Sequence, residues 1–309
     1  MVKRLISADA SDVLAMDGAA LKQSIKASEG RVVLSENVVT HEAMDGLTTS
    51  EYAAAFGADL ILLNALDVLK PVILGLYPGE ETLATAQPHL DGEVIHRLQH
   101  LVGRPIGVNL EPVDPAADMA ENRLVIPAGR MASEETLAAA QALGLNFVCL
   151  TGNPGTGVTN AQIAANIKVA KRVFHGLIIA GKMHGAGVNE PVVSIDATQA
   201  FLDAGADVIL VPAVGTVPGL DDADLKTIVQ LAHANGALVM STIGTSQEGS
   251  GASYIQAVAI RNKILGVDIQ HVGDAAWGVQ SPFENIYAMS KAIRGERHAL
   301  QRMARSINR

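Results

Sequence analysis

One lysine of the chain follows an apolar stretch directly, which is an unusual place for a cation. Lys182 comes after the run 177–181, "LIIAG". An amine in such surroundings loses hydration, and this lowers its pKa. A lysine of that kind can form a Schiff base with a carbonyl group or act as a general base. Two other roles stay open: a cation that holds a substrate or phosphate, and a structural partner of a carboxylate.

Carboxylates end three other apolar stretches: Glu36, Glu111 and Asp274. Carboxyl groups whose surroundings push their pKa values apart serve as general acid and general base. Their oxygens are also suitable ligands for Mg²⁺ or Mn²⁺. His184 lies two residues beyond Lys182 and is a candidate acid or base, or a further metal ligand. Because no segment has metal-ligand spacing, we expect no metal site and keep Mg²⁺ or Mn²⁺ as the alternative.

Two segments rich in glycine and hydroxyl groups are candidate anion sites: 151–159, "TGNPGTGVT", and 241–253, "STIGTSQEGSGAS". Glycines expose backbone N–H groups, and a helix that begins after such a segment adds its dipole. The Gly-Lys-Ser/Thr ending of nucleotide triphosphatases is absent. The predicted substrate- or phosphate-binding residues are Asn64, Asn109, Thr151, Gly152, Asn153, Gly155, Thr156, Gly157, Ser241, Gly244, Thr245 and Ser246. The alternative is that both segments are only tight turns.

Eight short apolar stretches must position these residues. Four begin with Gly-x-Asp/Asn, at 57–64, 144–151, 205–212 and 266–273, and four more lie between them, at 30–36, 103–111, 176–182 and 236–242. A helical pattern follows each one, at 50–57, 92–102, 133–143, 160–175, 194–204, 222–235, 253–265 and 283–305. Val/Ile/Leu strands that alternate with helices indicate a parallel sheet covered on its outer face.

Eight such units predict the α/β class and a (β/α)8 TIM barrel, with an open doubly wound sheet as the alternative. We expect one barrel over 31–309, preceded by an N-terminal helical extension over 1–30. Within the extension, 17–28 is a short helix that could close the N-terminal mouth. The longest segments after strands, 65–91 and 112–132, are candidate lids.

Alternation along each strand predicts which side chains face the barrel interior. The bulky Leu177 and Ile179 suit the helix layer, which leaves Lys182 facing inward. Near the last strand, Asp274 is expected to face inward as well. His271 has the opposite parity, so we expect it to be a core histidine that faces the helices. In a barrel, inward groups at the carboxyl ends of the strands form the active site.

The whole chain of 309 residues is 49% hydrophobic and carries a net charge of −9. Without a basic cluster, we expect no nucleic-acid partner and no membrane surface. Cys149 is the single cysteine, which excludes a disulfide framework. No apolar run is long enough for a signal peptide or a membrane span, and we therefore expect a cytoplasmic protein. The sequence leaves homo-oligomerisation open.

Motifs along most of the chain resemble one family. They include "SENVVT", "GADLILLNALDV", "RPIGVNLEPVD", "CLTGNPGTGVTN", "IIAGKMHGAGV", "GTSQEGS", "HVGDAAWG" and "SPFENIYAMSKAIRGERH". The chain resembles an uncharacterised bacterial (β/α)8-barrel family whose members are labelled phosphoenolpyruvate phosphonomutase-like or haloacid dehalogenase-like. This resemblance implies a barrel and brings no particular activity. At the level of fold, the strand pattern is also similar to ribulose-phosphate-binding barrels and class I aldolases.

Together these features predict a barrel enzyme acting on a small anionic metabolite, phosphorylated and sugar-like or a keto acid. The reaction would be aldolase-like lyase chemistry, or isomerase or epimerase chemistry, next to a carbonyl group. Lys182 would polarise or capture the carbonyl, and Glu36, Glu111 or Asp274 would move the proton. Two alternatives stay open: a divalent-metal-dependent hydrolase or lyase, and a non-catalytic barrel that binds a metabolite and regulates a partner.

Overall fold

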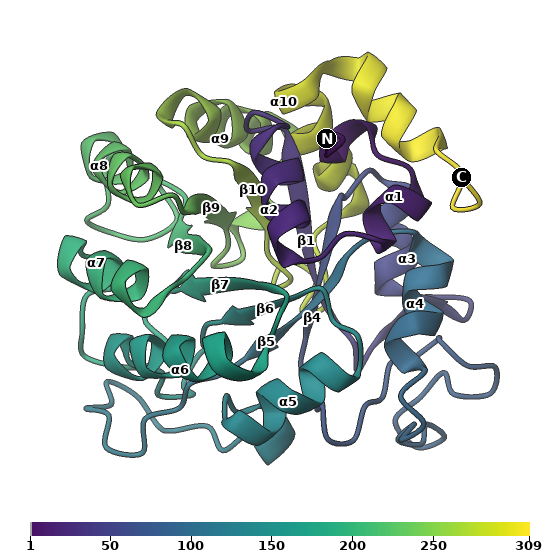
Figure 1. Cartoon of the computed structure of the whole chain (residues 1–309), viewed down its shortest axis with the longest axis horizontal. Coiled ribbons are helices and arrows are strands. Elements are labelled where there is room, and N and C mark those ends of the chain that lie inside the picture. The colour runs from purple at the N-terminus through teal and green to yellow at the C-terminus, as the bar shows by residue number, and fades with distance from the viewer. Residues whose placement is uncertain (1) are drawn as a thin grey trace.

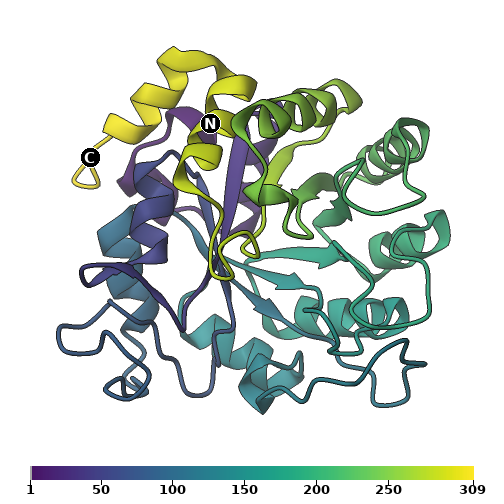
Figure 2. The same ribbon diagram turned by 180° about the vertical axis from the view of Figure 1, so that it is seen from behind.

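The computed structural model describes residues 2–309, and its centre is a closed parallel barrel. Figures 1 and 2 show the strands as an inner layer that the helices surround. Going round the barrel, the strand order is β1-β10-β9-β8-β7-β6-β5-β4. The strands are β1 (Val32–Val38), β4 (Leu60–Asn64), β5 (Ile106–Leu110), β6 (Phe147–Leu150), β7 (Leu177–Gly181), β8 (Val208–Pro212), β9 (Leu238–Ile243) and β10 (Ile269–Val272). The predicted (β/α)8 barrel is confirmed.

A helix follows every barrel strand. These helices are α3 (Thr49–Ala55), α4 (Val94–Val102), α5 (Glu134–Ala142), α6 (Asn160–Val173), α7 (Ile195–Ala204), α8 (Asp222–Ala234), α9 (Ala252–Leu265) and α10 (Phe283–Ala304). Shorter elements lie between them: the hairpin β2 (Glu42–Met44) and β3 (Leu47–Thr48), and the 3₁₀ turns η2 (Ala128–Arg130) and η3 (Gln247–Gly249). None of the helices within residues 2–309 combines the length and the apolar character that a bilayer span requires.

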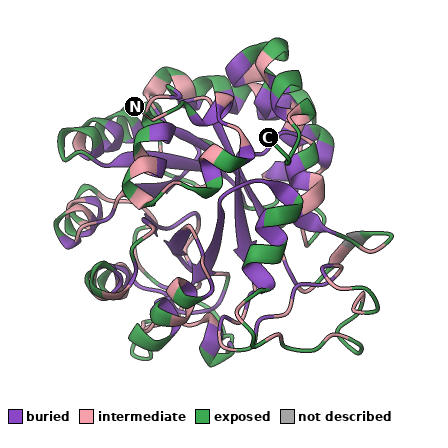
Figure 3. Cartoon of the chain, turned by 45° about the vertical axis from the view of Figure 1, so that its right-hand side comes forward, coloured by how far each residue is buried: buried purple, intermediate pink, exposed green. Residues whose placement is uncertain are grey.

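Each strand is apolar on both of its faces. On β4, Leu60 and Leu62 join the cluster inside the barrel, whereas Ile61 and Leu63 join the cluster between the sheet and the helices. Figure 3 shows the strands buried throughout and the outer faces of the helices exposed. Because water reaches neither face, burial of apolar surface stabilises both layers.

The N-terminal extension closes one end of the barrel. It contains η1 (Leu5–Ser7), α1 (Ala10–Leu14) and α2 (Gly18–Lys26). Leu21 and Ile25 of α2 are fully buried or nearly so and belong to the interior cluster. The helix predicted over 17–28 therefore covers the mouth opposite the carboxyl ends of the strands. The predicted active site is at the other mouth, at the carboxyl ends of the strands.

The C-terminal segment is helical over most of its length, as the pattern over 283–305 predicts. Helix α10 continues to Ala304 across a kink at Gly295, whose φ is 75°. Arg294 and Arg302 are buried, and both lie within 3.0 Å of the carboxylate of Asp59. Two of the basic residues therefore hold this helix against the barrel.

Two strands place their side chains opposite to the predicted parity. On β7, Leu177 and Ile179 face the interior, whereas Ile178 and Ala180 face the helices. On β10, Ile269 belongs to the interior cluster, so His271 shares its inward side. The predicted orientations of β7 and of His271 are therefore wrong. Strands buried on both faces carry bulky residues on both, so side-chain size does not indicate orientation.

Candidate active site

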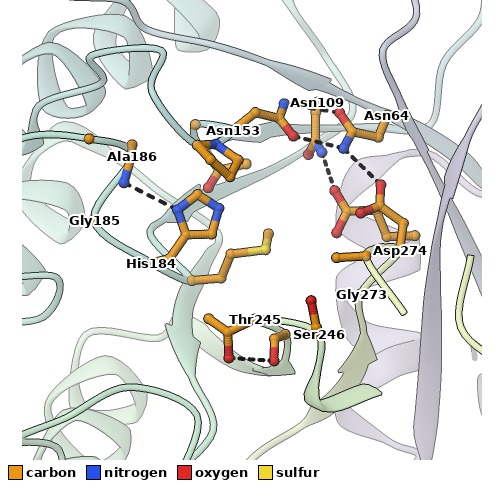
Figure 4. Close-up of a pocket in the computed structure, with 18 of the residues that line it drawn as sticks. Asn64, Asn109, Asn153, His184, Gly185, Ala186, Thr245, Ser246, Gly273 and Asp274 are labelled. Carbon is orange, nitrogen blue, oxygen red and sulfur yellow. Dashed lines mark hydrogen bonds between the residues drawn. The ribbon is translucent and has the colours of Figure 1, made fainter. Parts of the chain in front are cut away.

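A cavity of about 470 Å³ opens at the carboxyl ends of the barrel strands (Figure 4). Eleven of the predicted site residues line it: Glu36, Asn64, Asn109, Thr151, Gly152, Asn153, His184, Gly244, Thr245, Ser246 and Asp274. Six others do not: Glu111, Gly155, Thr156, Gly157, Lys182 and Ser241. The segment predicted as a lid, 112–132, contributes Ala120 and Glu121 to the lining. The cavity therefore gathers residues from distant parts of the sequence.

Lys182 lies outside this cavity. Its ammonium group forms an ion pair with Glu190, and the same carboxylate oxygen accepts a hydrogen bond from Asn160 N (2.7 Å), at the start of α6. The change of direction occurs at Gly181, where a Cβ would lie 2.0 Å from Leu210 O. Burial lowers the pKa of Lys182, and the hydrogen bond to Glu190 opposes this. The expectation that Lys182 faces the barrel interior is corrected: it pairs with Glu190 next to the N-terminus of α6.

Glu111 also serves the scaffold. Its carboxylate accepts a hydrogen bond from Arg130 (2.7 Å) and two from Asn153, one from the backbone N–H (2.9 Å) and one from the side chain (3.0 Å). Glu111 is 1% exposed. Since its oxygens are occupied by these donors, we interpret Glu111 as a residue that positions Asn153 at the cavity. The prediction that Glu111 lies at the reacting mouth is not supported by this geometry.

Several polar groups of the segment 151–159 form hydrogen bonds within the segment or with its neighbours. Thr156 Oγ1 donates to Asn153 O (2.8 Å), and Gly157 N donates to Ala186 O (3.0 Å). In the helix that follows, α6, the first N–H group, that of Asn160, donates a hydrogen bond to the carboxylate of Glu190. Gly155, Thr156 and Gly157 therefore shape the segment and do not line the cavity, and the anion at the N-terminus of α6 is a side chain of the protein itself.

On β9 the hydroxyl group that faces inward belongs to Thr242 and not to the predicted Ser241. Leu238 and Met240 belong to the interior cluster, so Thr242 faces inward and Ser241 faces the helix layer. Thr242 Oγ1 lies 2.7 Å from His271 Nδ1. Ser241 does not line the cavity, so this geometry does not support its predicted contact with a substrate.

Glu36, on β1, is a buried ionisable group of the cavity lining, with 2% exposure. One carboxylate oxygen accepts a hydrogen bond from Asn109 Nδ2, and the other lies 3.2 Å from His271 Nε2. Burial raises the pKa of Glu36 to about 7, with smaller increases from the carboxylates of Glu248 and Glu111. Burial also lowers the pKa of His271 to about 4. Near neutral pH the imidazole is uncharged, so Glu36 has no fixed positive partner.

Asp274 is the second carboxyl group with a shifted pKa. Asn64 donates a hydrogen bond to it (2.8 Å) and another to Asn153 Oδ1 (2.9 Å). Burial raises the pKa of Asp274 to about 7, and the charge of Glu36 adds to the shift. Two like charges in one site disfavour each other's ionisation, so one of the two carboxyl groups keeps a proton more readily.

His184 contributes a neutral donor. The backbone N–H of Ala186 donates to His184 Nδ1 (3.1 Å), which leaves the proton of the ring on Nε2. Burial lowers the pKa of His184 to about 4, and the charge of Lys182 adds to this. Figure 4 shows the imidazole at the side of the cavity across from Asn64 and Asp274. A neutral imidazole N–H can hydrogen-bond a carbonyl oxygen of a substrate.

Sequence reasoning missed Glu248, the only acidic residue of 241–253. It is 0% exposed and lines the cavity from η3. Its Oε1 accepts a hydrogen bond from Ala275 N (2.6 Å), whereas its Oε2 has no partner among the described residues. Burial raises the pKa of Glu248, and the charge of Asp274 contributes. The position of this acid in a strand-to-helix segment was the available signal.

The preceding turn is strained. Thr245 and Ser246 have φ values of 58° and 66°, a region that residues other than glycine seldom adopt. Both residues line the cavity beside Gly244. Backbone strain of this kind is concentrated at binding and catalytic sites, which is consistent with the predicted substrate contacts of this turn.

A metal centre made only of protein ligands is not visible: within residues 2–309, no three His, Cys, Asp or Glu side chains are grouped to hold a metal ion.

Solved structures that match this chain have low sequence identity to it. An archaeal fructose-1,6-bisphosphate aldolase is 16% identical, covers 86% of this chain and 95% of its own, and has a TM-score of 0.51. Thiamine phosphate pyrophosphorylase from Pyrococcus furiosus is 14% identical, with coverages of 86% and 96% and a TM-score of 0.48. A 2,3-dimethylmalate lyase of the PEP mutase/isocitrate lyase superfamily is 16% identical, with coverages of 84% and 82% and a TM-score of 0.47. The likeness to the aldolase shows a shared barrel fold.

No curated protein matches the sequence. A protein family described as a domain of unknown function, DUF7916, matches residues 6–309. The match spans the barrel and most of the N-terminal extension. The chain therefore belongs to the DUF7916 family.

Proposed function

We propose that the protein is an enzyme that moves a proton at a carbon next to a carbonyl group of a small polar substrate, as lyases and isomerases do. The observation that carries the proposal is the presence of two carboxyl groups, Glu36 and Asp274, whose pKa values are both raised to about 7 in one cavity. A general acid or base is most effective when its pKa lies near the working pH.

The surrounding groups support separate roles for the two carboxyl groups. Glu36 acts as the base, and Asp274, held by Asn64, returns the proton as the acid. The neutral Nε2–H of His184 stabilises the oxygen on which negative charge develops. Lys182 has no part in this scheme, because Glu190 holds its ammonium group away from the cavity. The reaction therefore proceeds without a Schiff base.

Isotope exchange tests the proposal without knowledge of the natural substrate. The probes are hydroxyacetone, dihydroxyacetone, aminoacetone and pyruvate in D₂O, and NMR follows deuterium incorporation next to the carbonyl. We expect the wild type to accelerate exchange of at least one probe. Glu36→Gln keeps the shape and the hydrogen bond to Asn109 but cannot accept the proton, so the rate should fall by about 100-fold or more.

Glu135→Gln is the matched control, because it removes the same charge at an exposed position of α5. Its exchange rate should equal that of the wild type. Failure of the wild type to exchange any of the probes, or full activity of Glu36→Gln, would contradict the proposed reaction.

A further inference from the structure

The charge of the cavity is the starting point for its ligand. Four carboxylate residues line it, and no lysine or arginine does. They are Glu36, Glu121, Glu248 and Asp274. Three of the four come from separate strand-to-helix segments and the fourth from the end of β1. Folding therefore concentrates negative charge here in spite of the mutual repulsion.

The basic residues next to the cavity are already engaged. Lys182 pairs with Glu190. Arg130 donates to Glu111 (2.7 Å). Arg123 donates to Asp114 O (2.7 Å). None of these cations offsets the charge of the lining carboxylates by a direct contact.

The lining also contains buried oxygen atoms without a hydrogen-bond partner among the described residues. Glu248 Oε2 and Asn109 Oδ1 are buried without a partner among residues 2–309, and their residues are 0% and 3% exposed. Thr151 Oγ1 is in the same state, and Thr151 is 1% exposed. A buried acceptor without a donor has lost its hydrogen bonds to water without replacement, which costs free energy in the empty site. A ligand that brings several N–H or O–H donors removes this cost.

We propose that the ligand of this cavity carries a protonated amine, bound by Glu248, and is a short hydroxyl-bearing carbonyl compound whose hydroxyl groups donate to Asn109 and Thr151. This inference names the substrate class of the proposed function and rests on it for the identity of the site. An ammonium group supplies three donors and one positive charge, which matches both the unpartnered acceptors and the carboxylates. The cavity volume of about 470 Å³ admits a small molecule of this kind.

Two other ligand classes fit the site less well. A phosphate group would meet the four carboxylates, and the N-terminus of α6, one of the two candidate anion sites, holds Glu190. A Mg²⁺ ion prefers several oxygen ligands in octahedral geometry, and the described residues provide no group of three acidic or histidine ligands for it. The amine is therefore the class that the observations favour.

Three polyols with the same carbon chain and different ends test the inference: glucamine with an amine, sorbitol with a hydroxyl group and gluconate with a carboxylate. Binding to the full chain is measured by calorimetry at about pH 8, where carboxyl groups with a pKa of about 7 are ionised. We expect glucamine to bind at least about tenfold more tightly than sorbitol. Gluconate should bind most weakly.

Glu248→Gln should abolish this preference for glucamine, because the amide keeps the hydrogen bond to Ala275 N but loses the charge. Glu135→Gln, with the same change of net charge outside the cavity, should retain it. Tighter binding of gluconate, of inorganic phosphate or of Mg²⁺ alone than of glucamine would overturn the inference, and so would an unchanged preference in Glu248→Gln. Loss of isotope exchange with intact amine selectivity would remove only the proposed reaction.

Discussion

Glu190→Ala should be the most destabilising of the charge-removing substitutions near the cavity, at about 3–5 kcal/mol of unfolding free energy. Lys182 is 1% exposed, and Glu190 is its only ion-pair partner among the described residues. Without the carboxylate, the ammonium group is left buried and uncompensated, and Asn160 N loses its acceptor at the start of α6. Urea denaturation of the variant against the wild type measures the difference.

Lys182→Met should lower the free energy of unfolding by less than Glu190→Ala does. In this variant Glu190 keeps its hydrogen bond from Asn160 N, and the side chain of Glu190 is 26% exposed. The double variant Lys182→Met/Glu190→Leu should regain most of the loss, since an apolar pair replaces a buried ion pair. The exposed pair Arg172–Glu134 provides the control, with side-chain exposures of 59% and 67%. Glu134→Ala should change stability little.

The same variants separate the structural role of Lys182 from the catalytic role expected from the sequence. Borohydride added with pyruvate or hydroxyacetone should leave no adduct on Lys182. Lys182→Met, once folded, should retain isotope exchange. An adduct on this lysine, or a stable Glu190→Ala protein, would show that the ion pair is not the reason for the burial of Lys182.

The fold was predictable because its signals are local. Each barrel strand is a short apolar run after a turn, and the helical pattern that follows covers one face of it. The glycines at 57, 144, 205 and 266 all adopt positive φ values, of 103°, 77°, 101° and 96°. Glycine at such positions ends a helix without steric cost, so the repeat in the sequence marks a real repeat of the backbone.

Strand parity predicted the site correctly where a strand keeps its alternation up to its last residue. Glu36, Asn64 and Asn109 lie on regular strands and face inward as their parity indicates. After Gly181 the chain passes against Leu210 O, so the alternation of β7 does not extend to Lys182. The orientation of a side chain at the end of a barrel strand therefore depends on contacts with the neighbouring strand as well as on parity.

The partners of the charged groups lie in segments whose closure the sequence does not reveal. Glu190 meets Asn160 thirty residues away. Glu248 lies in the 3₁₀ turn η3, and its carboxylate accepts a hydrogen bond from Ala275 N. Its position at the cavity therefore depends on how η3 packs against the segment after β10. Charge pairing over such separations follows from tertiary packing, so a single sequence leaves several partners open for every ionisable residue.

Glu36→Gln should stabilise the protein above neutral pH, and the gain should disappear in acid. The folded-state pKa of Glu36 is raised from 4.5 to about 7. Between these values the folded protein keeps a proton that the unfolded chain has released, so the contribution of Glu36 to stability is lost as the pH rises through 7. The shift corresponds to roughly 3 kcal/mol. The glutamine resembles the protonated acid and carries no such loss.

The substitution removes the titration of Glu36 and, with it, the contribution of its charge to the raised pKa of Asp274, so both changes favour the variant as the pH rises. His271 has a pKa lowered to about 4, so its contribution is present above pH 6.5 and lost as the pH falls. This opposes the trend of Glu36 in the wild type, but it is common to both proteins. The gain in unfolding free energy of Glu36→Gln should therefore be small at pH 4.5 and grow up to about pH 7.5, whereas that of Glu135→Gln should stay flat. A difference that does not vary with pH would mean that Glu36 is ionised in the folded protein throughout, and the base proposed for the reaction would lose its physical support.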